Sequence, residues 1–132
     1  MKKVIAVFFQ NRKGEILLVR RSEGDKNRMR PLKWHCVSGT VEEGETYLEC
    51  FNREVKEEVG LVNCEIDRSV VFQNLYGREM FEVFLALCKL GKGDKIQLTK
   101  EKLEYKWVVI ADIKDWDITP AVIIDLEKIG LI

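Results

Sequence analysis

Three glutamates, Glu54, Glu57 and Glu58, fall within the short run REVKEE, which has the character of a helix. At about 100° per residue, their side chains share one stripe of roughly 100° on the helix surface. Like charges at this spacing destabilise a helix, so the stripe needs a compensating cation. Its carboxylate oxygens suit Mg²⁺ or Mn²⁺, and such a site favours attack of water on a diphosphate linkage. A solvated acidic helix face is the alternative.

The helix that must position these acids is predicted to start at Thr46 and to end at Gly60. Thr46 and Glu49 have the spacing of a capping box, and Gly60 is suited to the left-handed residue that follows a helix. The stripe expected to pack against a sheet consists of Leu48, Phe51, Val55 and Val59.

Segments rich in β-branched and aromatic residues on both sides of this helix predict a sheet. A turn sequence after residue 10 predicts an opening hairpin, and the apolar segment 78–90 is expected to be a central strand. The predicted strands cover residues 4–10, 15–20, 34–38, 64–76, 78–90 and 105–110, with a short helical turn at 111–116 and a closing helix at 120–129. This order indicates an α/β fold with a mixed sheet between helices, as one domain over residues 1–132.

The composition narrows the class of protein. The chain has 22 basic and 22 acidic residues and no formal net charge, which argues against a general nucleic-acid or membrane-surface binder. Cations concentrated between residues 11 and 33 suit a small-molecule polyphosphate partner. The four cysteines form no CxxC pair and the chain has one histidine, so a zinc site is not expected. We expect a cytoplasmic protein without a membrane span, either a monomer or a homodimer.

The residues that flank the acids follow a longer and more specific pattern. Nine fixed positions over 23 residues read Gly39, five residues, Glu45, seven residues, then Arg53-Glu54-Val55-x-Glu57-Glu58-x-Gly60-Leu61. This pattern resembles the signature of the MutT-like Nudix hydrolases at every fixed position. The resemblance implies the Nudix α/β/α sandwich over essentially the whole chain. It also implies Mg²⁺-dependent hydrolysis of a diphosphate linkage, with Mn²⁺ as a possible substitute.

In this family the glutamates of the signature bind the metal ions. Carried over to this sequence, Glu54 and Glu58 are the preferred metal ligands. Glu57 is either a further ligand or the residue that activates water, and the motif does not decide between these roles. The carbonyl group of Gly39 often joins the metal shell in relatives.

Arg53 belongs to the same catalytic set, with a positioning role. The resemblance implies that Arg53 and Glu45 form an ion pair that holds the loop against the helix. A further metal ligand is expected from a downstream loop, where relatives commonly place a glutamate six residues before a tryptophan. That spacing selects Glu101, before Trp107. Glu104 is the alternative ligand, unless it is only a solvated charge at a strand edge.

The segments WHCVSGTVEEGET, REVKEEVG and LEYKW are similar to the bacterial dihydroneopterin triphosphate pyrophosphohydrolases, which also hydrolyse dATP. This likeness implies that Arg20, Trp34 and Ser38 contact the substrate, with Arg20 at a phosphate group and Trp34 at a ring. An ordinary core aromatic is the alternative for Trp34. Hydrolysis of a dinucleoside polyphosphate or another nucleoside diphosphate derivative is the second enzymatic reading. A ligand-binding or regulatory module is the non-enzymatic one, although such relatives usually lose glutamates that this chain retains.

Overall fold

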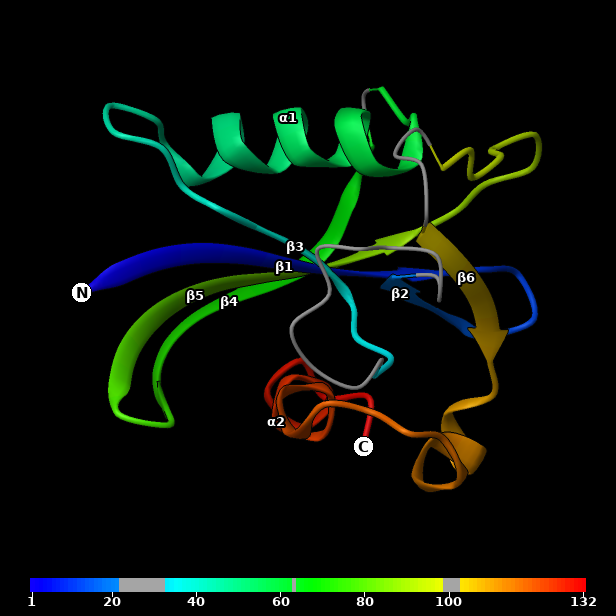
Figure 1. Ribbon diagram of the computed structural model, residues 1–132. Coiled ribbons are helices and arrows are strands. Elements are labelled where there is room, and N and C mark those ends of the chain that lie inside the picture. Colours follow the sequence, from blue (N-terminus) through cyan, green and yellow to red (C-terminus); the bar gives the residue numbers. More distant parts are fainter. Residues whose placement is uncertain (22–32, 63, 99–102) are drawn as a thin grey trace.

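The structure is a computed structural model that describes residues 1–21, 33–62, 64–98 and 103–132. Within these residues the chain forms a six-stranded sheet with a helix on each face (Figure 1). The strands are β1 (Lys2–Gln10), β2 (Ile16–Arg21), β3 (Val37–Thr40), β4 (Ile66–Tyr76), β5 (Glu79–Lys89) and β6 (Leu103–Val108), and the helices are α1 (Tyr47–Val59), the 3-10 helix η1 (Ile110–Asp115) and α2 (Pro120–Lys128).

The sheet is mixed, as the sequence predicts. Its strand order is β4-β5-β1-β2-β6, and β3 also pairs with β1. β1 and β5 run parallel, whereas the other neighbouring strands are antiparallel. The opening β1–β2 hairpin is confirmed, and so is the interior position of β5, which lies between β4 and β1. Residues 5–9 of β1 are buried because helices cover both faces of this part of the sheet.

Two hydrophobic cores lie on opposite faces of the sheet. On one face, Phe51 and Val55 of α1 pack with Ile5, Val7 and Phe9 of β1. On the other face, α2 and η1 pack against the alternate residues of the same strands, and this core includes Ala6, Phe8, Leu18, Ile113, Val122 and Leu126. Figure 1 shows α1 above the sheet and α2 below it. The predicted α/β sandwich is therefore confirmed.

The capping box at the start of α1 is also confirmed. The Thr46 hydroxyl accepts a hydrogen bond from the backbone N–H of Glu49 at 3.1 Å, and the Glu49 carboxylate accepts one from the N–H of Thr46 at 3.0 Å. Gly60 ends the helix with a φ of 70° and donates its N–H to the carbonyl of Lys56. These local interactions fix the ends of the helix that carries the acids.

The predicted buried stripe of α1 was wrong at Leu48, which is 55% exposed, while Cys50 is buried in its place. Helical geometry places Tyr47 and Cys50 on the same side as Glu54, about 100° or more away from Leu48. The Tyr47 ring stacks on Phe84, with centroids 5.4 Å apart, and so occupies the sheet side of the first turn. The side of α1 that packs on the sheet therefore includes Cys50 and, one turn later, Glu54.

The third strand also differs from the prediction. We expected a strand over residues 34–38 and a loop from Gly39, whereas β3 runs from Val37 to Thr40. Gly39 pairs with Ile5 of β1, which extends the strand through the glycine. Trp34 and His35 form isolated bridges with Ile118 and Val19. The glycine of the signature is thus held in the sheet instead of in a free loop.

Candidate active site

The predicted ion pair between Arg53 and Glu45 is present and has two hydrogen bonds. Arg53 Nε lies 2.8 Å from Glu45 Oε2, and its Nη2 lies 2.9 Å from Glu45 Oε1. Nη2 also donates to the carbonyl of Thr40 at 3.2 Å. The hydrogen bond from Arg53 is the main reason that the pKa of Glu45 falls to about 2. Arg53 therefore joins α1 to both ends of the loop that follows β3.

The remaining guanidinium nitrogen of Arg53 faces the acidic stripe. Nη1 lies 2.8 Å from Glu54 Oε1 and 3.5 Å from Glu57 Oε2, and Glu42 approaches Nη2 at 3.8 Å. Four carboxylates, those of Glu42, Glu45, Glu54 and Glu57, thus surround a single cation. Within the described residues, the single positive charge of Arg53 balances one of these four negative charges, so the carboxylates exceed it by three. This excess is the electrostatic reason for a further cation at the site.

Glu54 is buried, with 7% of its surface exposed, and its carboxyl group lies directly against Gly39. A Cβ atom at position 39 would lie less than 3.0 Å from the Cγ, Cδ and Oε1 atoms of Glu54. The backbone of Gly39 does not have a positive φ, so space and not backbone conformation requires glycine here. Gly39 and Arg53 therefore hold Glu54 from two sides.

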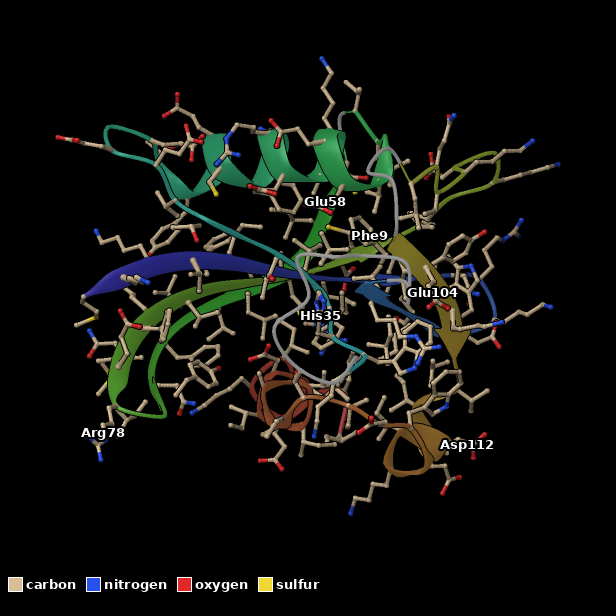
Figure 2. The ribbon with its side chains drawn as sticks, viewed as in Figure 1. Phe9, His35, Glu58, Arg78, Glu104 and Asp112 are labelled. Atoms are coloured by element: carbon tan, nitrogen blue, oxygen red, sulfur yellow. The ribbon has the colours of Figure 1, made fainter. Side chains whose placement is uncertain are left out.

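The other two acids of the stripe are more accessible to solvent. Glu58 is half-buried, and Figure 2 shows it on the sheet side of α1. Glu57 lies on the exposed side of Arg53, with 48% of its side chain exposed. In the described part of the chain, no three His, Cys, Asp or Glu side chains are grouped as a formed metal site. The carboxylate donors suit Mg²⁺ chemically, but in this structure Arg53 contacts two of them.

The two downstream candidates have different outcomes. Glu101 lies outside the described residues, so its role stays a prediction. Glu104 lies on the edge strand β6, and its carboxylate accepts hydrogen bonds from Arg20 Nε at 3.1 Å and Nη2 at 3.4 Å. It shares a face of β6 with Val108, which packs in the α2 core. Glu104 therefore faces away from α1, which counts against it as a ligand beside Glu54.

The predicted substrate contacts lie on the α2 side of the sheet. Arg20 stacks on the Trp34 ring, with its Cζ atom 4.4 Å from the ring centroid, and also pairs with Glu104. Trp34 is 4% exposed and meets Trp116 edge to face, in agreement with the alternative of a core aromatic. Ser38 is exposed and lines a pocket that also includes Gly39. Contact of these three residues with substrate stays a prediction.

Sequence reasoning missed one buried acid, Asp125 of α2, which is 3% exposed. It lies in the apolar stripe of α2 between Val122 and Ile129, next to Leu126. A charged residue at a position that helical periodicity assigns to the core was the available signal.

Comparison with known proteins places this arrangement in a family. The model of the NUDIX domain matches residues 1–126. The chain belongs to the Nudix family. The expected enzyme class, a Nudix hydrolase, is thereby confirmed, and the signature residues around Gly39 and Glu54 are the ones that the geometry brings together. None of the helices in the described residues is long and apolar enough to cross a membrane.

Several relatives are similar along their full length. The nucleoside triphosphatase NudI of Escherichia coli is 25% identical over 141 aligned residues, which cover 99% of this Nudix chain and 98% of NudI. A Caenorhabditis elegans protein that carries the nudix hydrolase name is 35% identical over 83 residues, 62% of this chain but only 22% of that longer protein.

Solved structures share the fold. A C. elegans Ap4A hydrolase has a TM-score of 0.75 at 23% identity, covering 99% of this chain and 96% of that one. The dihydroneopterin triphosphate pyrophosphohydrolase of E. coli has a TM-score of 0.67 at 22% identity, covering 96% and 92%. At these identities the likeness concerns the fold, and the substrate must be argued separately.

Proposed function

We propose that this Nudix hydrolase cleaves a diphosphate linkage in a nucleoside triphosphate or a related compound, of the dATP or dihydroneopterin triphosphate type, and releases pyrophosphate. Water attacks a phosphorus atom, the P–O–P bridge breaks, and the organic product keeps one phosphate group. The observation that carries the proposal is the excess of carboxylates around Arg53, with one of them, Glu54, fixed against Gly39. NudI, similar over its full length, is named a nucleoside triphosphatase, which supports this substrate class.

The carboxylates of Glu54, Glu57 and Glu58, with the Gly39 carbonyl and Glu101, would hold Mg²⁺ or Mn²⁺. When bound, such an ion would neutralise phosphate charge and polarise the phosphoryl group. Their oxygen donors match what these cations prefer. Arg53 takes a positioning role, because hydrogen bonds to Glu45 and to the Thr40 carbonyl fix its guanidinium group in place.

The three acids of the stripe differ in how far the fold fixes them. Glu54 is buried between Gly39 and Arg53, so its carboxylate is oriented before substrate arrives. Glu57 is exposed and lies farther from Arg53, which leaves its carboxylate accessible to water. Glu57 is therefore the residue of the stripe best suited to accept the proton of the attacking water, with metal ligation as its alternative role.

The test is a substrate panel, with pyrophosphate release followed for dATP and dihydroneopterin triphosphate, and the monophosphate and nucleotide products followed for ADP-ribose and diadenosine tetraphosphate. We expect Mg²⁺-dependent turnover of a triphosphate, and a loss on the order of 100-fold in Glu58→Gln. The matched control is Glu127→Gln, which changes an exposed acid on α2 and should retain full activity. Absence of metal-dependent hydrolysis from the whole panel would overturn the proposal.

A further inference from the structure

A pocket of about 710 Å³ lies on the α2 side of the sheet and reaches the candidate active site. Ser38, Gly39 and Thr40 form one part of its lining. Gly39 is also the residue against which the Glu54 carboxyl group packs. A ligand in this pocket would therefore lie next to the acids across a single strand, β3. The volume falls within the range of pockets that hold molecules the size of a mononucleotide.

Asp125 lines this pocket and has an incomplete set of hydrogen bonds. Its Oδ2 accepts a weak hydrogen bond from the thiol of Cys36 at 3.9 Å. Its Oδ1 is buried and has no hydrogen-bond partner among the described residues. Burial of an acceptor without a donor destabilises a fold, so native proteins rarely retain one without a reason. Within the part of the chain that the structure describes, the geometry thus leaves one oxygen unsatisfied, and an N–H or O–H group of a ligand would supply the missing donor.

The other lining groups restrict what that ligand can be. Ala6, Val83 and Val122 are apolar and buried, and such walls suit a flat ring. The His35 ring nitrogen Nδ1 lies 2.6 Å from the carbonyl of Cys36 and donates a hydrogen bond to it. No Lys or Arg occurs in the described lining that could neutralise Asp125. An apolar pocket with one unsatisfied carboxylate oxygen suits a flat heterocycle that carries an N–H group as the donor.

We infer that Asp125 is a specificity-determining residue that accepts a hydrogen bond from the exocyclic amino group of a nitrogen heterocycle, such as an aminopurine or a pterin. The inference rests on the proposed function, since it places the ring of the substrate in this pocket and its phosphate groups at the acids. Substrates with an amino group beside a ring nitrogen are favoured over those that carry hydrogen or a carbonyl group there. Asp125 acts in binding and takes no part in bond cleavage.

The test measures equilibrium binding of nucleoside monophosphates, so that it does not depend on hydrolysis. Two pairs differ only in the amino group: dGMP with dIMP, and dAMP with the monophosphate of purine deoxyriboside. In the unaltered protein we expect the amino-bearing member of at least one pair to bind about tenfold more tightly. In Asp125→Ala the preference should fall to about one. Asp112→Ala should retain the preference, because Asp112 is an exposed acid on η1 outside the pocket lining, and Figure 2 shows it well apart from His35, which does line the pocket.

Equal binding of both members of both pairs to the unaltered protein overturns the inference, and this result needs no variant. A preference that survives in a folded Asp125→Ala protein also overturns it. The outcome is separate from the proposed function. Discrimination between monophosphates without hydrolysis of any triphosphate would sink the proposed function and leave this inference standing. Hydrolysis of a triphosphate without discrimination between the monophosphates would overturn this inference and leave the proposed function standing.

Discussion

Gly39→Ala tests the packing on which the candidate site depends. A Cβ at this position would lie less than 3.0 Å from three atoms of the Glu54 side chain. Because Glu54 is buried and held by Arg53, it cannot move without losing that contact. Overpacking of this kind costs about 1–3 kcal/mol of unfolding free energy. We expect Gly39→Ala to lose stability in this range and to lose activity because the Glu54 carboxylate is displaced.

A double-mutant cycle shows whether Glu54 is the cause. In Glu54→Ala the three clashing atoms are gone, so adding Gly39→Ala should be nearly neutral, or stabilise by about 0.4–1 kcal/mol through the unfolded state. The coupling free energy should therefore reach about 1–3 kcal/mol, measured by urea unfolding of all four proteins. Gly91→Ala is the control, since its Cβ would lie 3.5 Å from Asp94 Oδ2 and Gly91 does not have a positive φ. An additive cycle would refute this account of Gly39.

Three further results are expected. Burial raises the pKa of Asp125 to about 7. Between about pH 4 and 7 the unfolded chain therefore releases a proton that the folded protein retains. The unfolding free energy should fall by about 4 kcal/mol as the pH rises through this window. The unfolding free energy of Asp125→Asn, relative to that of the parent protein, should therefore rise between about pH 4 and 7 and stay constant above pH 7, as measured by urea unfolding. A difference in unfolding free energy that does not depend on pH would contradict the assignment. Thr46→Ala removes the hydroxyl of the capping box and should cost about 1 kcal/mol in the same assay, whereas an unchanged stability would mean that the cap contributes nothing. Glu101→Gln should lower turnover strongly at saturating Mg²⁺, while Glu104→Gln should affect it little because Glu104 pairs with Arg20; the opposite ranking would make Glu104 the downstream ligand.

Local sequence was enough for the features that depend on near neighbours along the chain. The capping box and the glycine after α1 are set by side chains and backbone groups within a few residues of each other, and both were predicted correctly. The ion pair of Arg53 with Glu45 is also present, as the resemblance to the Nudix signature implied. The α/β class followed from the order of apolar segments, because a helix and a strand each need a packing partner.

The environment of each acid was decided by tertiary structure. Periodicity places Glu54, Glu57 and Glu58 on one stripe, but only the packing of α1 on the sheet buries Glu54 against Gly39 and exposes Glu57. The contact of Arg20 with Glu104 joins residues 84 positions apart and depends on the pairing of β2 with β6.

The surroundings of Asp125 were also decided by tertiary structure. Its position in the stripe of α2 is visible in the sequence, but the pocket beside it exists only because α2 packs under β1, β3 and β5. The sequence determined by itself which acids are available and how the helix that carries three of them begins and ends. The fold decided which of those acids are buried, which are paired and which line a pocket, because burial and pairing depend on strand register and helix packing between distant segments.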